Sequence, residues 1–285
     1  MHELAKFAMR GPRQAVMLAG ISVLIPMMFW VGAAIIGLTT LRKGSSQGFV
    51  VFAWASIPAL GWWFSMQDPG ALIVLFSAWL MSSVLRYSVS WQLTLVTGGV
   101  ISLATGILAP FIMPELIDTL MTLTDEVFRE LAEQSQQEYN SELQGEFQSL
   151  MIASFAASFY GMAIASVFVA RSWQSQLYNP GGWRGEFHQL RLSPKLLMVM
   201  LLFVVVSPSI GIDWALVMMV VTMPILVCGL ALVHGVIGKK RLSGQWLFGF
   251  YLSVVMLFPT VLILTTMLAM IDSLVNFRSR IQVPK

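Results

Sequence analysis

The sequence predicts an all-α membrane protein, a polytopic transmembrane bundle of about eight spans with an extramembrane amphipathic helical segment. Three observations predict this class. Of the 285 residues, 57% are hydrophobic and 11% are charged, whereas soluble domains contain roughly 25% charged residues. Mean hydropathy is +0.76, and the apolar residues form long runs that suit a bilayer. One acidic stretch, 115–149, interrupts these runs, so we expect a single membrane domain over 1–285 with 115–149 as an insertion outside the membrane.

Eight apolar runs follow one another between polar breaks, and each is a predicted span: 15–41, 48–66, 71–85, 92–114, 150–170, 196–210, 214–237 and 246–271. None contains Asp, Glu, Lys or Arg, although Asp213 and Asp272 flank two of them. Proton relays and ion pumps usually place ionisable residues inside the bilayer. We therefore expect no charge-coupled transport.

Pro26 and Pro259 lie in the middle of the first and last runs. A central proline either kinks one helix or separates two short helices of a hairpin. The kinked helix is the simpler expectation, because a helix of about 13 residues spans only about 20 Å. A hairpin would instead return a chain terminus, with its basic residues, to the side of the other basic loops. The sequence leaves both alternatives open, and with them the side of each terminus.

Basic residues gather in short breaks, at Arg42 and Lys43, in the loop 171–195 and in "GKKR" at 238–241. The positive-inside rule places such loops in the cytoplasm. We expect a multi-pass protein of the bacterial cytoplasmic (inner) membrane, with basic loops cytoplasmic and the acidic 115–149 segment external. The lipid bilayer is its first expected partner.

The acidic segment has an apolar stripe at helical spacing, formed by Leu116, Leu120, Leu123, Val127 and Leu131, and then by Tyr139, Leu143, Phe147 and Leu150. This pattern predicts two amphipathic helices that extend the adjoining membrane helices. They either pair with each other or lie on the membrane surface. Two roles are open for them, as a cap over an outward-facing cavity or as a partner-binding surface.

The common nucleotide-binding and zinc-protease motifs are missing from the sequence. It contains no GxxxxGK[ST] and no HExxH. The three histidines are scattered, and the single cysteine, Cys228, has no partner for a disulfide or a metal site. We expect no enzymatic activity, no cofactor, no metal and no nucleic acid.

Two predicted spans carry small residues four apart, Ala153, Ala157, Gly161 and Ala165 in one and Gly98, Ser102 and Gly106 in the other. Small residues allow close backbone contact between helices in lipid. The two spans either pack on each other or present a face to a partner helix or a second copy. Trp62 and Trp63 lie near a span end, as in the interfacial aromatic belt, with a ligand-facing role as the alternative.

The polar stretch "LYNPGGWRGEFHQLRLSPK" at 177–195 is the most distinctive break. "NPGG" favours a turn, and the residues after it suit a short helix in the cytoplasmic headgroup region. We expect this loop to dock a cytoplasmic partner through Asn179, Pro180, Gly181, Gly182, Arg184, Glu186, Phe187 and Arg191.

This loop, "GLALVHGVIGKKR" at 229–241 and the ending "MIDSLVNFRSR" at 270–280 resemble the YybS-like bacterial integral membrane proteins. The resemblance runs from "GLTTLRKG" at 37–44 to Arg280, and its C-terminal motif consists of Asp272, Phe277 and Arg278. That family is distantly similar to the S components of energy-coupling-factor transporters. The resemblance implies a non-enzymatic small-molecule-binding subunit with an outward-facing pocket and a separate energising partner. The alternative is a membrane scaffold or assembly protein that acts through helix–helix and loop contacts.

Overall fold

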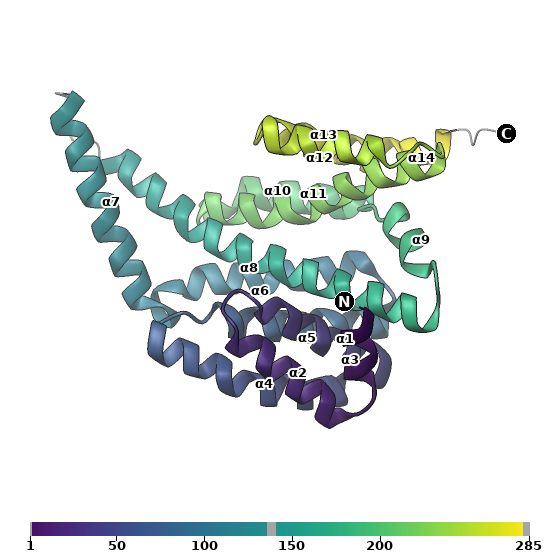
Figure 1. The fold of residues 1–285 in the computed structure, drawn as a ribbon. Coiled ribbons are helices and arrows are strands. Elements are labelled where there is room, and N and C mark those ends of the chain that lie inside the picture. The colour runs from purple at the N-terminus through teal and green to yellow at the C-terminus, as the bar shows by residue number, and fades with distance from the viewer. Residues whose placement is uncertain (1, 136–140, 282–285) are drawn as a thin grey trace.

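The computed structural model describes residues 2–135 and 141–281, and this part of the chain forms helices and no strands. In order, the helices are α1 (His2–Met9), α2 (Pro12–Leu24), α3 (Phe29–Lys43), α4 (Ser45–Met66), α5 (Gly70–Ser88), α6 (Trp91–Ile112), α7 (Pro114–Ser135), α8 (Ser141–Tyr178), α9 (Gly182–Gln189), α10 (Pro194–Val206), a 3₁₀ turn (Ser207–Ile210), α11 (Trp214–Lys239), α12 (Gln245–Met256), α13 (Thr260–Val275) and α14 (Phe277–Arg280). Most of the apolar helices lie roughly parallel and stack in layers, whereas α7 and α9 do not (Figure 1).

Five of the described helices, α4, α5, α6, α8 and α11, are long and apolar enough to cross a membrane. The count rises to six if α9 and the segment Pro194–Ile210, which meet at a bend of 58°, form one broken span. The fold is therefore that of a helical protein compatible with several membrane crossings. Two predicted runs do not appear as single helices, which is one reason why the eight expected spans are not recovered.

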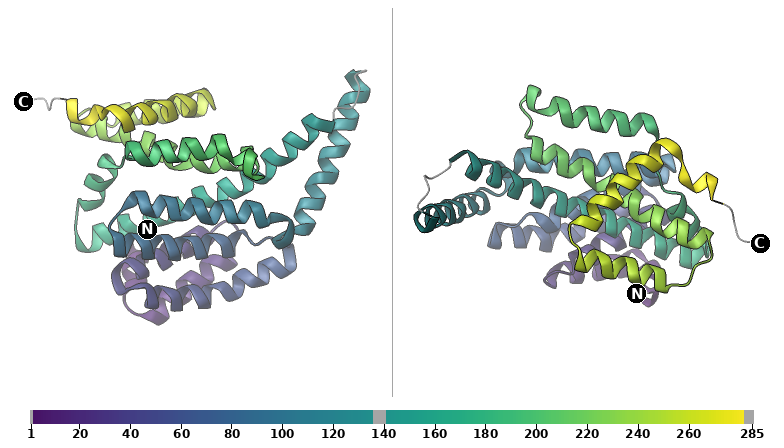
Figure 2. Two further views of the ribbon diagram at one scale, coloured as in Figure 1. Left: turned by 180° about the vertical axis from the view of Figure 1, so that it is seen from behind. Right: turned by 90° about the horizontal axis from the view of Figure 1, so that it is seen from above.

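The first and last runs are each divided into two helices rather than kinked. The chain leaves helical geometry at 25–28, beside Pro26, where Met27 has a φ of 62°. It does so again at 257–259, a break that ends with Pro259. The simpler expectation of one kinked helix is wrong at both prolines. Helix α3 runs back along α2, and α13 turns back from the end of α12 at an angle to it (Figures 1 and 2).

The hairpin α2–α3 is stable despite its short helices because the protein itself surrounds it. Eleven of the fifteen residues of α3 are buried, from Val31 to Leu41. Gly48 of α4 approaches α3 so closely that an added Cβ would lie 3.0 Å from the Cα of Thr40. A helix packed on all sides does not need to match the bilayer thickness by itself.

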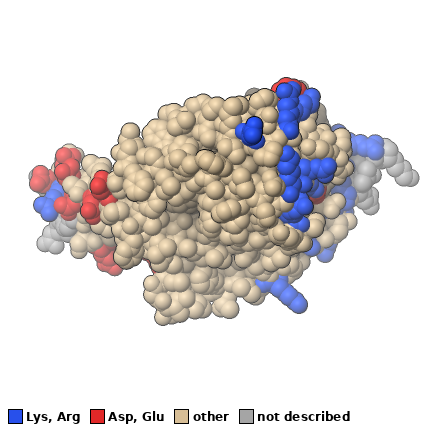
Figure 3. Space-filling model, turned by 90° about the horizontal axis from the view of Figure 1, so that it is seen from below, with Lys and Arg blue, Asp and Glu red and all other residues tan. Residues whose placement is uncertain are grey.

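Charge divides the molecule along the helix direction (Figure 3). One end, called here the basic end, carries the start of α2 and the last residues of α3, α5, α8, α11 and α13, and both chain termini lie toward it (Figures 1 and 2). The described Lys and Arg residues cluster there, with Arg129 as the exception. The opposite, acidic end carries α7 and the start of α8.

Helix α7 leaves the bundle at the acidic end, and the N-terminal part of the 38-residue α8 extends alongside it (Figure 1). The two segments touch through Phe128 and Phe147, whose ring centroids are 5.9 Å apart. Gln144 Nε2 also donates a hydrogen bond of 3.3 Å to Asp125 Oδ1. Glu138 and Tyr139 of the predicted insertion lie outside the described residues, as does Lys285 at the C-terminus.

Candidate functional site at the basic end

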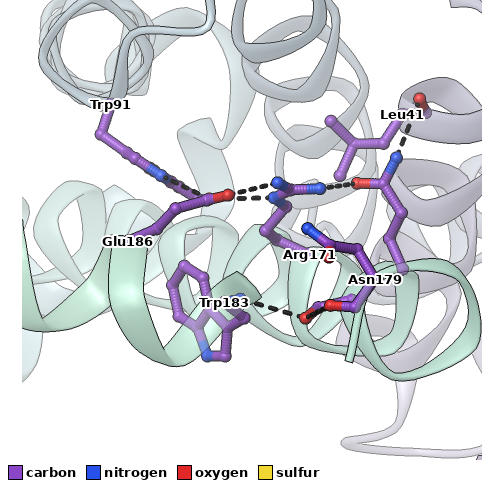
Figure 4. Close-up of polar contacts among 8 residues, drawn as sticks. Leu41, Trp91, Arg171, Asn179, Trp183 and Glu186 are labelled. Carbon is purple, nitrogen blue, oxygen red and sulfur yellow. Dashed lines mark hydrogen bonds and ion pairs between the residues drawn. The ribbon is translucent and has the colours of Figure 1, made fainter. Parts of the chain in front are cut away.

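The loop after α8 folds as its turn chemistry predicts. Gly182 N donates to Asn179 O at 3.1 Å, and Gly181, with a φ of 87°, occupies the position of a type II turn that requires a positive φ. The hydroxyl of Ser175 donates to Asn179 O at 2.8 Å and accepts from Trp183 N at 3.0 Å (Figure 4). These bonds direct α9 across the basic end of the bundle (Figure 1).

Glu186 fastens α9 to the membrane helices. Its carboxylate accepts hydrogen bonds from Arg171 Nε at 3.0 Å, from Arg171 Nη2 and from Trp91 Nε1 at 3.3 Å (Figure 4). Arg171 Nη1 donates to Gln174 Oε1 at 2.5 Å, and Gln174 Nε2 donates to Leu41 O at 3.2 Å. A two-pronged arginine–carboxylate pair is geometrically specific, so α9 has a fixed position relative to α3, α6 and α8.

The C-terminal motif forms a second fastening point. The amide of Phe277 donates to Asp272 Oδ1 at 2.8 Å. Asp272 Oδ2 and Arg278 Nε form an ion pair at 3.2 Å, and their side chains are only 1% and 12% exposed. This pair does not meet hydrogen-bond geometry, so Coulombic attraction rather than a directed bond holds these two atoms. Arg278 uses its other nitrogens to donate to His188 O at 2.6 Å and to Cys228 O at 3.2 Å.

The polar loop and the C-terminal motif therefore meet, although about 90 residues separate them. Arg191 Nη1 donates to Asp272 O at 3.4 Å, and Lys239 Nζ donates to Arg278 O at 2.6 Å. A Cβ added to Gly235 would lie 2.7 Å from His188 O, so only glycine allows α11 to approach the end of α9 this closely. The three segments that carried the resemblance, 177–195, 229–241 and 270–280, thus form one structural junction.

A cleft of about 780 Å³ opens at the basic end between α8, α9, α11 and α12. We call it the basic-end cleft, and it is lined by residues that include Phe168, Arg184, His188, Ile237, Arg241 and Tyr251. Aromatic rings form much of its wall. The ring of Phe187 lies 5.5 Å from Phe168, 5.3 Å from Trp183 and 5.4 Å from His234. His234 Nε2 and Tyr251 Oη are 2.8 Å apart and join α11 to α12.

The charge of the basic-end cleft is one-sided, since two arginines and two histidines line it and no Asp or Glu does among the described residues. Partial burial lowers the pKa of His188, and the nearby Arg184, His234 and Arg278 lower it further. His188 is therefore mainly neutral near pH 7. The permanent positive charge of the cleft comes from Arg184 and Arg241.

The structure separates the predicted docking residues into two groups. Asn179, Pro180, Gly181 and Arg184 are exposed. The other members, Gly182, Glu186, Phe187 and Arg191, are half-buried, and the last three make the internal contacts described above. A partner at this end would therefore contact the turn and Arg184, whereas Glu186 and Arg191 hold the loop itself.

Trp62 and Trp63 each bind a backbone carbonyl. The indole nitrogen of Trp62 donates to Val23 O at 2.9 Å, and that of Trp63 donates to Ile112 O at 2.8 Å. These bonds connect the end of α4 to the ends of α2 and α6 at the acidic end. They use the single polar atom of each indole, which leaves only the ring faces for any ligand.

The small residues of α6 lie against other helices of the same chain. Ser102 Oγ donates to Ala156 O of α8 at 2.8 Å. A Cβ added to Gly98 would lie 2.4 Å from Tyr160 Cε2, and one added to Gly106 would lie 2.4 Å from Leu216 Cδ1. In α8, Ala153 and Ala157 are buried, Gly161 is half-buried near Met223, and Ala165 is exposed. The predicted stripe on α8 is thus an internal contact only over its first part.

Several residues of the basic end carried no recognisable signal in the sequence. Arg171 and Glu186 are fifteen positions apart across a turn, and no spacing rule pairs them. Trp91, His234 and Tyr251 lie in or beside three different predicted spans, and no local pattern connects them. In the described part of the chain, no three His, Cys, Asp or Glu side chains lie close enough together to hold a metal ion.

The gap at the acidic end is much smaller than the basic-end cleft. An apolar gap between α6 and α8, beside Thr105, Met113 and Phe155, leaves about 0 Å³ for a water-sized molecule. No protein-family model, curated protein or solved structure matches this chain. The function is therefore inferred from the geometry of the basic end.

Proposed function

We propose that this chain is a non-enzymatic, transport-type binding subunit of the bacterial cytoplasmic membrane, and that the basic-end cleft holds its small-molecule ligand. One observation carries the proposal. The cleft, at about 780 Å³, has the volume of a ligand site, and a few cationic groups converge over a largely aromatic wall. The S-component resemblance agrees with a binding role and with a separate energising partner.

The proposed orientation places the basic end in the cytoplasm. The positive-inside rule supports it, because the last turns of α3, α5 and α11 all carry basic residues. Both hairpins support it as well, since they return the chain termini to that end. The ligand would then enter from the cytoplasmic side or the inner leaflet, which is the opposite side from the outward-facing pocket that the resemblance implies.

A cavity-filling variant tests this function. Gly244 lines the cleft in helical geometry, and a Cβ added to it meets nothing within 4 Å. We expect Gly244→Phe to fold normally and to lose a molecule that copurifies with the wild type, measured by native mass spectrometry from membranes. Gly185→Phe is the matched control, because Gly185 is also open-faced and is absent from the cleft lining. An identical bound mass in both variants would exclude the cleft as the site.

A second function, a membrane scaffold or assembly protein, is favoured by the segments that leave the bundle. Helix α7 exposes Leu123 and Val127, which are 53% and 52% exposed, away from the body of the molecule. The turn at 179–181 and Arg184 are exposed at the other end. The same mass spectra decide this alternative, because a scaffold would appear as a homo-oligomer or with a partner protein attached.

A further inference from the structure

We propose that the ligand of the basic-end cleft is an amphiphile whose phosphate headgroup has a net negative charge, held in the cytoplasmic leaflet with its apolar chain beside α12. This inference rests on the proposed function and specifies the chemistry of the same site. It follows from the unpaired charge in the cleft, the absence of opposing carboxylates in its lining, and an apolar exit along α12.

The arginines of the cleft differ from those that hold the fold together. Arg171 and Arg278 are committed to carboxylates and backbone carbonyls. Within the described residues, Arg184 and Arg241 form no ion pair and no side-chain hydrogen bond, so their charge is available to a ligand. Guanidinium groups bind phosphate through paired N–H donors, which makes them suited to this headgroup.

Arg184 and His188 converge on one point of α11. A Cβ added to Gly238 would lie 2.8 Å from His188 Nδ1 and 3.7 Å from Arg184 Nη2. Both side chains therefore lie over the glycine surface of the helix, on the wall of the cleft. Helix α12 also begins here, because its N-cap Gly244 and Leu247 line the cleft and no side chain caps its first amides. The positive end of that helix adds to the attraction for an anion.

The carboxylates nearest in the chain cannot neutralise this charge. Glu186, on the same short helix as Arg184, is bound by Arg171 and Trp91. Asp272 is paired with Arg278. Arg184 and Arg241 would therefore repel a cationic ligand, with no carboxylate in the lining to offset the repulsion. A neutral ligand would form no ion pair with either arginine.

The surroundings of α12 supply the apolar part of the site. None of the residues of α12 is buried, so this helix lies at the edge of the bundle. A second cavity of about 630 Å³ lies between α11 and α12, is lined by Val233, Trp246 and Phe250, and shares Ile237 with the basic-end cleft. An acyl or prenyl chain would fit along this helix while the headgroup stays among the arginines.

Native mass spectrometry with defined lipids tests the inference. Phosphatidic acid is the phosphate-headed probe, phosphatidylcholine is the zwitterionic lipid control, and glycerol 3-phosphate is the soluble headgroup without a chain. We expect phosphatidic acid to bind at least about tenfold more tightly than phosphatidylcholine, since charge-assisted contacts are among the stronger hydrogen bonds. Glycerol 3-phosphate should not displace it, because the chain contributes to binding.

The double variant Arg184→Gln and Arg241→Gln should remove that preference. The matched control is Arg13→Gln and Arg280→Gln, which removes the same charge from exposed positions at the same end and should keep it. Equal binding of the two lipids, an unchanged preference in the cleft variant, or full displacement by glycerol 3-phosphate would each overturn the inference. If Gly244→Phe still expels a copurifying molecule in that case, the binding function stands and only the ligand class is wrong.

Discussion

Asp272 and Arg278 form a buried ion pair that joins several helices at the basic end. Asp272 lies on α13 and is 1% exposed, and Arg278 of α14 pairs with it and donates to one backbone carbonyl at the end of α9 and one in α11. Isolated burial of either charge would be costly, and only the combination of ion pair and hydrogen bonds offsets it. The C-terminal motif of Asp272, Phe277 and Arg278 therefore has a structural role.

We expect Asp272→Asn to lower the free energy of unfolding by about 3 kcal/mol, because it leaves the guanidinium of Arg278 without its counter-charge in a buried position. Thermal or denaturant unfolding of the detergent-purified protein measures the change. The control Glu3→Gln removes an exposed ion pair with Lys6 and should leave stability nearly unchanged. Equal stability of the two variants would show that the buried pair does not hold the junction.

At the scale of elements, the α12–α13 hairpin is attached to the bundle through α13. Gly229 of α11 marks that contact, since an added Cβ would lie 2.5 Å from the backbone oxygen of Thr265. A backbone atom cannot rotate away as the end of a side chain can, so α13 would have to shift as a whole. Helix α12 makes no comparable contact, which leaves the cavities on its two sides open.

Gly229→Ala should therefore destabilise the protein by about 1–3 kcal/mol, as overpacking at a close contact usually does. Unfolding of the purified protein gives the value, and hydrogen exchange of α13 shows where the structure loosens. Gly249→Ala on α12 is the control, because its added Cβ meets nothing within 4 Å and a helical Gly→Ala change should be neutral or stabilising. The same loss in both variants would contradict a specific contact at Gly229.

For the whole molecule, the two hairpins decide the topology. Each converts one predicted crossing into two helices that reverse the chain, so both termini lie at the basic end with the cleft (Figures 1 and 2). The acidic arm of α7 and α8 then lies on the opposite side. This separation of charge is the one that the proposed orientation, with the basic end in the cytoplasm, requires.

Single cysteines at His2, Arg280 and Glu126 test this topology, because native Cys228 is buried. We expect a membrane-impermeant maleimide to label the Glu126→Cys variant in intact cells, and to label the other two only after the cells are opened. Labelling of a terminus from the same side as Glu126→Cys would require a single crossing at Pro26 or Pro259.

The helical class, the membrane-like composition and the polar break at 177–195 follow from the sequence alone. These are local properties, because each depends only on the types and spacing of residues within one short stretch of the chain. The turn at Asn179–Gly182 was predictable for the same reason, since proline and glycine restrict the backbone directly. The apolar stripe of 115–131 likewise anticipated α7.

Only the tertiary structure decided the hairpins, the junction and the cleft. A central proline permits both a kink and a hairpin, and the choice depends on neighbours such as α4 and α8 that shelter a short helix. The contacts of Glu186 with Arg171, and of His188 with Arg278, join residues 15 and 90 positions apart. Such pairs form when packed helices bring their ends together, and no periodicity within one helix encodes them.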